Sequence, residues 1–483
     1  MGFKVVETTI DVLQQAMTNG ETTSVEIVCA YLKRIAELDK AGPRLNAVLE
    51  INPDAIYIAE AMDRERSLNK LRGRLHGIPI MLKDNIDTND GMHTSAGSLA
   101  LAGDYAGRDA FLVQKLREAG AVIIGKTNMT EFANFMTEGM PNGYSSRGGQ
   151  VLNPYDADSR PGGSSSGSGV AVAASMCAAA VGTETSGSIL CPANQCGIVG
   201  IKPTVGLISR YGITPIAFSQ DTAGPMARTV TDAAILLGAM TGLDGKDPAT
   251  LSSEDRYYDD YTVFLEAKGL EGARIGVPRT GFWDSLDEEQ KRMAERALLA
   301  MQEAGAVLVD PAPIPSAGEI RGSSVLMYEF KASMNAYLAG RGAGTQIRSL
   351  RDIIAFNNEH PEETLKYGQK LLTHAEEKTS GTLTEPDYIH DRFNDLRLSR
   401  TEGIDAVLDA YGLDAVVFPG DEGETIGARA GYPSVLVPAG FLSSGLPFGI
   451  TFTGRAYSEP LLLKLAYAFE QATHHRRAPV FFL

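Results

Sequence analysis

Apolar residues recur at helical spacing near the start of the chain. After Thr22, Thr23 and Ser24, residue types that favour a helix N-terminus, apolar side chains follow at positions 25, 27, 28, 31, 32 and 35. This spacing places them on one face of an amphipathic helix. We therefore predict that residues 1–70 form an N-terminal helical segment.

The pattern changes at Gly77 to short apolar runs with few polar positions. Residues 77–83 (GIPIMLK) and 120–125 (GAVIIG) are typical of strands buried on both faces. Residues 109–119, which lie between them, again have helical spacing. This alternation of strand, helix and strand predicts an α/β core.

The second half of the chain is first charged and helical and then returns to the earlier pattern. We predict strands at 413–419, 432–438 and 448–453 and helices at 229–241 and 459–473. Because the α/β pattern returns, we predict one large domain over residues 1–483. Its parts are the N-terminal segment, a core at 71–240, a variable and mostly helical insertion at 245–400, and a C-terminal part at 401–483 that rejoins the core.

Composition and charge narrow the possible partners. Apolar residues make up 43% of the chain and charged residues 22%, as in ordinary soluble globular proteins. The formal net charge of −16 argues against a surface that binds nucleic acid. The longest apolar stretch, residues 170–181, is too short to cross a bilayer. We therefore expect a soluble protein that binds neither nucleic acid nor membrane.

Cysteine usage favours a reducing compartment. Four cysteines in 483 residues, and no signal-peptide pattern over residues 1–15, predict free thiols and a cytoplasmic location. Cys191 and Cys196 lie five positions apart without a nearby pair of histidines, which is not a zinc-binding pattern.

Two clusters of glycine and serine lie between positions 160 and 204. The first (PGGSSSGSG, 161–169) contains Ser164, and the second (TETSGSI, 183–189) contains Ser188, 24 positions later. Such clusters offer backbone N–H groups, hydroxyls and tight turns but little packing volume. Placed around one short buried helix, they predict a site for a reacting carbonyl group.

Two short motifs compete for this region. Residues 120–127 (GAVIIGKT) match the phosphate-binding pattern GxxxxGK[ST], but the β-branched residues inside it favour a strand over a curled loop, so we interpret the match as coincidence. Residues 163–167 (GSSSG) match the nucleophile elbow GxSxG, which would make Ser165 the nucleophile of an α/β-hydrolase esterase. No apolar strand precedes Gly163, and no downstream histidine has a suitable context, so this remains the weaker alternative.

Lys83 offers a base other than histidine for activating a serine in this region. A lysine at the end of an apolar strand loses its charge easily when buried, because desolvation can lower its pKa by about 3–5. A neutral amine of this kind can accept a proton from a serine hydroxyl.

Taken with Lys83, Ser164 and Ser188, the chain resembles the amidase signature family. Five blocks occur in the family's order: GIPIMLKDN (77–85), GKTNMTEF (125–132), PGGSS (161–165), GTETSGSI (182–189) and DTAGPMAR (221–228). The resemblance implies an α/β fold in which helices cover both faces of a mixed, mostly central sheet. It also implies an enzyme that hydrolyses carboxylic amides without a cofactor or a metal.

The resemblance also implies the role of each site residue. Ser188 is the expected nucleophile, Lys83 the general base, and Ser164, after a cis peptide bond, the relay between them. The expected oxyanion hole consists of the backbone N–H groups of Thr185, Ser186, Gly187 and Ser188. Ser165 is expected to support Ser164, and Asp221 is expected to pair with Arg228 behind the loops.

Departures from the family pattern concern the substrate. Ser166 and Ser186 replace glycines, Glu184 replaces an aspartate, and Leu190 replaces an arginine beside the nucleophile. Loss of that cation favours a neutral or apolar amide, and the chain looks most like bacterial peptide amidases and acyl-amidases. The alternative within the family is the glutaminase-type A subunit of a tRNA-dependent amidotransferase, which works with a partner subunit. For the amidase we expect a small-molecule or peptide amide as substrate and a monomer or homodimer.

Overall fold

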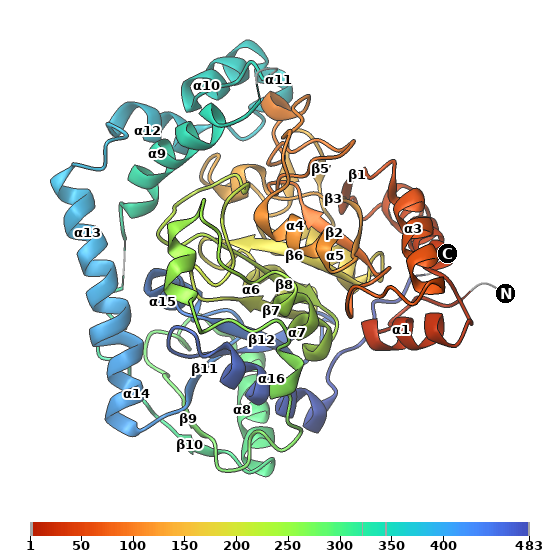
Figure 1. Ribbon diagram of the computed structural model, residues 1–483. Coiled ribbons are helices and arrows are strands. Elements are labelled where there is room, and N and C mark those ends of the chain that lie inside the picture. The colour runs from red at the N-terminus through yellow and green to blue at the C-terminus, as the bar shows by residue number, and fades with distance from the viewer. Residues whose placement is uncertain (1–2, 321, 343–344, 482–483) are drawn as a thin grey trace.

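Eleven strands of the described residues form one mixed sheet through the middle of the molecule (Figure 1). The computed structural model describes residues 3–320, 322–342 and 345–481. Residues 1 and 2, which belong to the segment 1–15 considered above for a signal peptide, lie outside the described residues. In sheet order the strands are β1 (Val48–Ile51), β3 (Val122–Thr127), β2 (Pro79–Lys83), β6 (Ala179–Glu184), β8 (Thr222–Ala227), β7 (Val199–Lys202), β12 (Ser434–Phe441), β13 (Pro447–Thr453), β11 (Ala415–Pro419), β9 (Arg274–Gly276) and β10 (Val307–Val309). A separate hairpin consists of β4 (Tyr144–Ser145) and β5 (Gly149–Gln150).

The predicted apolar runs form the inner strands. β2 lies parallel to both β3 and β6, and all its residues from Pro79 to Lys83 are buried. β12 and β13 pair antiparallel in the middle of the sheet, as their apolar sequences predict. The predicted α/β fold with a mixed central sheet is therefore confirmed.

Three short strands lie where we predicted helical structure. β1 falls inside the N-terminal segment and pairs antiparallel with β3, whereas β9 and β10 extend the opposite edge of the sheet from within the 245–400 region. Each is only three or four residues long and partly exposed. Strands this short have too few positions to show a period-two pattern in the sequence. They form because they pair with a neighbouring strand.

Helices cover both faces of the sheet. α5 and α6 pack together on one face, and α7, α8 and α16 cover the other. The α-helices are α1 (Ile10–Thr18), α2 (Ser24–Ile35), α3 (Ala55–Ser67), α4 (Phe111–Glu118), α5 (Ser166–Ala173), α6 (Leu190–Gln195), α7 (Val230–Gly238), α8 (Glu288–Glu303), α9 (Val325–Ala339), α10 (Leu350–Glu359), α11 (Pro361–Thr364), α12 (Lys370–Lys378), α13 (Pro386–Leu396), α14 (Asp405–Tyr411), α15 (Glu424–Ala430) and α16 (Glu459–Thr473). Shorter helical turns are η1 (Ala36–Lys40), η2 (Leu99–Leu101), η3 (Glu131–Asn134), η4 (Pro248–Ser253), η5 (Thr262–Phe264) and η6 (Arg397–Ile404).

Helices α9 to α14 form a peripheral layer beside the sheet (Figure 1). Phe330 and Met334 of α9 pack with Phe132 and Phe135 around η3 in an apolar cluster that is separate from the main core. This layer therefore rests on the loops that follow β3.

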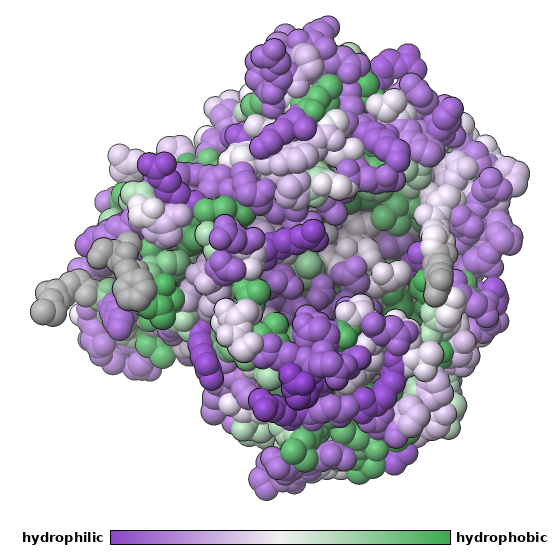
Figure 2. Space-filling model, turned by 180° about the vertical axis from the view of Figure 1, so that it is seen from behind, coloured by the Kyte–Doolittle hydropathy of each residue, from purple (hydrophilic) through white to green (hydrophobic). Residues whose placement is uncertain are grey.

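Figure 2 shows the surface on the side opposite to Figure 1, for the residues that it colours by hydropathy. Seen from behind, it is mostly hydrophilic, with small scattered apolar patches (Figure 2). Within the described part of the chain, no helix has the length and apolar composition needed to cross a membrane.

Candidate active site

The two glycine–serine clusters meet at one end of β6. Ser164 follows a cis peptide bond from Gly163, directly before α5, and Ser188 lies in the turn between β6 and α6. The backbone N–H of Ser165 donates to the carbonyl oxygen of Ser188 at 3.1 Å. The clusters, 24 positions apart in the sequence, are thus directly bonded to each other in the fold.

Lys83 reaches this meeting point from the end of β2. Its Nζ donates to Ser164 Oγ at 2.7 Å, to Thr183 Oγ1 at 2.9 Å and to the Thr183 carbonyl at 3.1 Å. Lys83 and Ser164 are both fully buried. Desolvation lowers the pKa of Lys83 from 10.5 to about 7, against the opposing effect of the Glu184 and Asp221 carboxylates. A large fraction of the amine is therefore neutral near pH 7.

Ser188 lies beside this pair and borders open space. It is 6% exposed and lines a cavity of about 260 Å³ together with Gly163 and Ser186. Among the described residues, no hydrogen bond joins Ser188 Oγ to Ser164 Oγ. The structure therefore bonds Lys83 to Ser164 and places Ser188 next to them, without a hydrogen bond between the two hydroxyls.

Buried carboxylates hold the turn that carries Ser188. Glu184 accepts hydrogen bonds from the N–H groups of Ile189 at 2.7 Å and Leu190 at 3.0 Å. Asp221 accepts from Thr185 Oγ1 at 2.5 Å. Within the described part of the chain, the N–H groups of Thr185, Ser186 and Ser188 have no protein acceptor, as an oxyanion hole requires. Burial raises the pKa of Glu184, and the N–H of Gly187, which faces this carboxylate, opposes that rise.

The predicted pairing of Asp221 with Arg228 is wrong. Asp221 bonds to the turn and to the N–H groups of Ile216 and Ala217, both at 2.9 Å, and burial raises its pKa to about 6. Arg228 points away and donates to the carbonyls of Cys177 and Thr8, each at 2.8 Å. Both residues flank β8, and their side chains serve different parts of the core.

Ser165 is placed for support rather than for attack. Its Oγ is fully buried, donates to the Thr183 carbonyl at 3.0 Å and accepts from the Thr183 N–H at 3.2 Å. It therefore braces the residue that holds Lys83 and does not touch Ser164 through its side chain. Irregular chain precedes Gly163, and no histidine of the described residues lines either cavity of the site. The geometry does not favour an α/β-hydrolase elbow.

The segment that matches a phosphate loop is an extended strand. Residues Val122–Thr127 form β3, and Lys126 Nζ is buried, donating to the Ile86 carbonyl at 2.5 Å and to Thr94 Oγ1 at 3.0 Å. A buried strand cannot curl its N–H groups around a phosphate.

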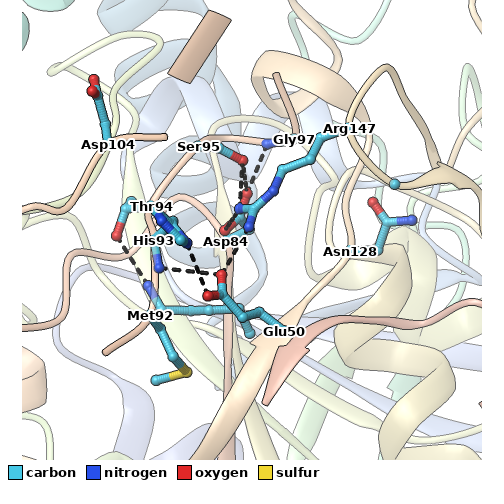
Figure 3. A network of polar contacts seen from close by, with 12 residues as sticks. Glu50, Asp84, Met92, His93, Thr94, Ser95, Gly97, Asp104, Asn128 and Arg147 are labelled. Atoms are coloured by element: carbon cyan, nitrogen blue, oxygen red, sulfur yellow. Dashed lines mark hydrogen bonds and ion pairs between the residues drawn. The ribbon is translucent and has the colours of Figure 1, made fainter. Parts of the chain in front are cut away.

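A polar network anchors the loop that follows Lys83 (Figure 3). Asp84 accepts hydrogen bonds from Ser95 Oγ and from the Gly97 N–H, the latter at 3.0 Å. Arg147 bridges Asp84 and Glu50, at 3.4 and 2.8 Å. These bonds fix the backbone on the far side of Lys83, so its side chain is directed toward Ser164.

A larger cavity of about 550 Å³ adjoins the site. Thr183 and Thr185 form one wall, and Ala336 and Tyr337 of α9 form another. Ala133, Thr185 and Ile216 line both this cavity and the smaller one, so the two are neighbours. Sequence analysis did not find Ala133, Ile216 or the α9 residues, because small apolar residues outside the glycine–serine clusters carry no chemical signal.

Two acidic residues on the other side of the small cavity were also missed. Asp421, just before α15, and Glu424, its first residue, line this cavity together with Ser188. Burial raises the pKa of Glu424 well above its usual value, and the neighbouring Asp421 adds to the effect. Their positions so far along the chain gave no reason to connect them with the serines.

The contact between Glu424 and Gly187 leads to a prediction. Gly187 has φ of +75°, and a Cβ there would collide with the carboxylate of Glu424. We expect Gly187→Ala to displace the turn and to lower kcat by at least about 100-fold, the typical effect of losing one oxyanion-hole donor. Steady-state kinetics measure this effect.

Gly139→Ala is the matched control. Gly139 has φ of +77°, but no atom lies within 4 Å of the position that a Cβ would take, so the substitution introduces backbone strain without a collision. It should lower the melting temperature while kcat is retained. Wild-type kcat in Gly187→Ala would contradict the assigned role of the turn.

Comparison with known proteins agrees with this geometry. A model of the Amidase family matches residues 26–428. The structure of the native peptide amidase from Stenotrophomonas maltophilia is 48% identical, with a TM-score of 0.94 and 99% of each chain covered. A probable amidase of Arabidopsis thaliana is 41% identical over 99% of this chain and 92% of that protein. The A subunit of the glutamyl-tRNA(Gln) amidotransferase of Gloeothece citriformis is 33% identical, covering 97% and 98%.

Proposed function

The chain belongs to the amidase family and is an amide-hydrolysing enzyme, and from this premise we propose that hydrolysis proceeds through a covalent acyl-enzyme on Ser188. The observation that carries the proposal is the buried 2.7 Å hydrogen bond from Lys83 Nζ to Ser164 Oγ, directly beside Ser188. A serine hydroxyl is a weak nucleophile, so it needs a neutral base within reach. Lys83, with its pKa lowered by burial, is that base.

The first half of the reaction begins with proton transfer. As Ser188 Oγ attacks the carbonyl carbon of the amide, its proton passes to Ser164 Oγ, and the Ser164 proton passes to Lys83 Nζ. The serine hydroxyls draw together in this step, because catalytic hydrogen bonds often tighten only when substrate is bound. The negative charge on the substrate oxygen is stabilised by the N–H groups of Thr185, Ser186 and Ser188.

The second half releases the amine and then the acid. Ser164 gives its proton to the amide nitrogen and recovers one from Lys83, the C–N bond breaks, and ammonia or an amine leaves. Water then attacks the acyl-enzyme by the same relay, its proton returning to Ser188 as the ester bond breaks. Lys83 ends neutral, and all atoms and charges balance.

We propose a neutral or apolar amide, such as a peptide C-terminal amide, as the substrate. The larger cavity, which we assign to the acyl group, has apolar side chains such as Ile216 and Ala336 and also charged ones such as Arg210 and Lys246. Similarity to the Stenotrophomonas maltophilia peptide amidase supports this substrate class.

A glutaminase-type A subunit is the second candidate, supported by the 33% identity to the A subunit of an amidotransferase. Glutamine carries a charged ammonium and carboxylate, which need opposite charges in the pocket. We favour the peptide or acyl amide because the chain is 48% identical to the Stenotrophomonas maltophilia peptide amidase and only 33% identical to this A subunit. The same proposal places the enzyme in the cytoplasm, supported by four cysteines without disulfide bonds.

The substrate proposal predicts a clear order among amides. Ammonia or amine release is measured with a peptide C-terminal amide, an anilide, a long-chain amide and glutamine. We expect kcat/KM for the peptide amide to exceed that for glutamine by at least about 100-fold. Turnover of glutamine alone, or activity that appears only when a partner subunit is added, would favour the second candidate instead.

A further inference from the structure

The outer end of the larger cavity carries cations and aromatic rings that the mechanism does not use. We call this end the rim, and its residues are Arg108, Arg210, Tyr211, Phe218 and Lys246. The cavity extends from Thr183 and Thr185, which are buried near Ser188, to Phe218 and Lys246, whose side chains are exposed. Because the reacting carbonyl lies at the inner end, the rim faces the part of the acyl group that is farthest from the scissile bond.

Tyr211 holds two of these cations at the cavity wall. The guanidinium carbon of Arg108 lies 4.9 Å from the centroid of the Tyr211 ring, and Lys246 Nζ lies 4.4 Å from it. Lys246 Nζ also donates to the Tyr211 hydroxyl at 3.3 Å. A cation is attracted to the face of an aromatic ring, because the ring carries partial negative charge there. The ring therefore restrains both side chains beside the cavity.

Arg108 and Arg210 are already paired with carboxylates of the protein. Arg108 Nε donates to Asp87 at 3.2 Å, and one of its terminal nitrogens donates to the Gly340 carbonyl at 2.9 Å. Arg210 binds Asp247 through two nitrogens, with Nε at 2.8 Å from the carboxylate. The charges of both guanidinium groups are thus balanced within the fold.

Lys246 is a rim cation without such a partner. Within the described part of the chain, no carboxylate forms an ion pair with its Nζ, and the Tyr211 hydroxyl is its one hydrogen-bond acceptor. The carboxylates of Glu184 and Asp221, which also line the cavity, hold the Ser188 turn. Since an ammonium group has three N–H donors, Lys246 retains donors and an unbalanced positive charge for a ligand in the cavity.

We propose that Lys246 is a specificity-determining residue that binds a carboxylate on the acyl part of the substrate, such as the side chain of an acidic residue in a peptide amide. This inference rests on the proposed function, and the residue that carries the scissile amide is still neutral or apolar. The ammonium and the carboxylate form an ion pair, while Tyr211 and Phe218 contact the apolar part of the same side chain. The net charge of −16 repels anions in general, so a preference for an acidic substrate has to come from a local cation.

The test compares N-acetylated tetrapeptide amides that end in leucine amide. Glutamate, glutamine or lysine is placed in turn at each preceding position. At about 50 mM salt, we expect kcat/KM for the glutamate peptide to exceed that for the glutamine peptide about threefold at one position, the size typical of an exposed ion pair. The difference should lie in KM, because the contact is the same in the ground state and the transition state. It should shrink at about 0.5 M salt, which screens exposed charges.

Variants at residue 246 give the sharpest result. Lys246→Met should abolish the glutamate advantage, and Lys246→Glu should reverse it, so that the lysine peptide becomes the better substrate. The side chain is exposed, so both variants should fold, and each ratio compares two substrates of one enzyme. Lys366→Met is the matched control and should keep the wild-type ratio. Lys366 is also exposed and lies 5.1 Å from the centroid of the Tyr144 ring, but it is not among the described residues that line either cavity.

Three outcomes would overturn the inference. They are equal kcat/KM for the glutamate and glutamine peptides at every position, a glutamate advantage that persists in both Lys246 variants, and a loss of the advantage in Lys366→Met as well. Turnover of the glutamine peptides by the wild type is measured first. Absence of turnover would overturn the proposed function, whereas turnover without a preference for glutamate overturns only the role of Lys246.

Discussion

Replacing Ser188 by alanine is expected to lower kcat for amide hydrolysis by about 10⁴- to 10⁶-fold, the range seen when a serine hydrolase loses its nucleophile. The substitution removes one oxygen from a side chain that is 6% exposed, so the fold should be retained. KM should change little, because the acyl group binds in the neighbouring cavity. Single-turnover and steady-state assays of ammonia release measure the effect.

Two other serines serve as comparisons. Ser165→Ala removes a hydroxyl that braces Thr183 and should cost far less activity than Ser188→Ala. Ser444→Ala, at an exposed turn remote from the site, should behave as wild type. Loss of activity in Ser165→Ala with full activity in Ser188→Ala would instead identify Ser165 as the nucleophile of an esterase-like elbow.

Replacing Lys83 by methionine is expected to lower kcat by about 10⁴-fold, the upper range for loss of a general base. The pH profile gives the stricter test. Burial lowers the pKa of Lys83 to about 7, and the reaction needs the neutral amine. Wild-type activity should therefore rise as pH increases through about 7 and should level off above it. The residual activity of Lys83→Met should lack this rise, and a rise that survives in the variant would contradict the assignment.

The free energy of unfolding should also depend on the titration of Lys83, and this contribution should increase with pH. The folded protein releases the Lys83 proton near pH 7, whereas the unfolded chain keeps it up to about 10.5. Between these values the unfolded state binds more protons, so Lys83 makes the free energy of unfolding rise with pH, by at most about 1.4 kcal/mol per pH unit. The difference in unfolding free energy between wild type and Lys83→Met should follow this slope in denaturant titrations.

The sequence predicted those parts of the fold that have strong local patterns. The apolar runs at 77–83 and 120–125 became β2 and β3, and the helix predicted at 459–473 is α16. The short edge strands β1, β9 and β10 could not be predicted, because pairing with neighbouring strands determines them. The other predicted elements begin or end a few residues from their predicted bounds, also because contacts with neighbouring elements determine where they end.

The residues of the candidate site could likewise be predicted only in part. Sequence analysis singled out Lys83, Ser164 and Ser188, which the fold brings together, because hydroxyls, glycines and a lysine at the end of an apolar strand have a distinct chemistry. Glu424 and the α9 wall were missed, because only tertiary structure brings residues 137 or more positions beyond Ser188 to its side. The predicted Asp221–Arg228 pair is wrong because the two residues lie at opposite ends of β8, and side chains an odd number of positions apart along an extended chain point to opposite faces.

Covalent labelling tests the central claim most directly. The wild-type protein is treated with a fluorophosphonate, which reacts with activated serines, and the modified peptide is located by mass spectrometry. A single adduct on Ser188, absent in Ser188→Ala and formed at least about 100-fold more slowly in Lys83→Met, is the predicted result. An adduct on Ser165, or labelling of Ser188 at the same rate without Lys83, would contradict the account.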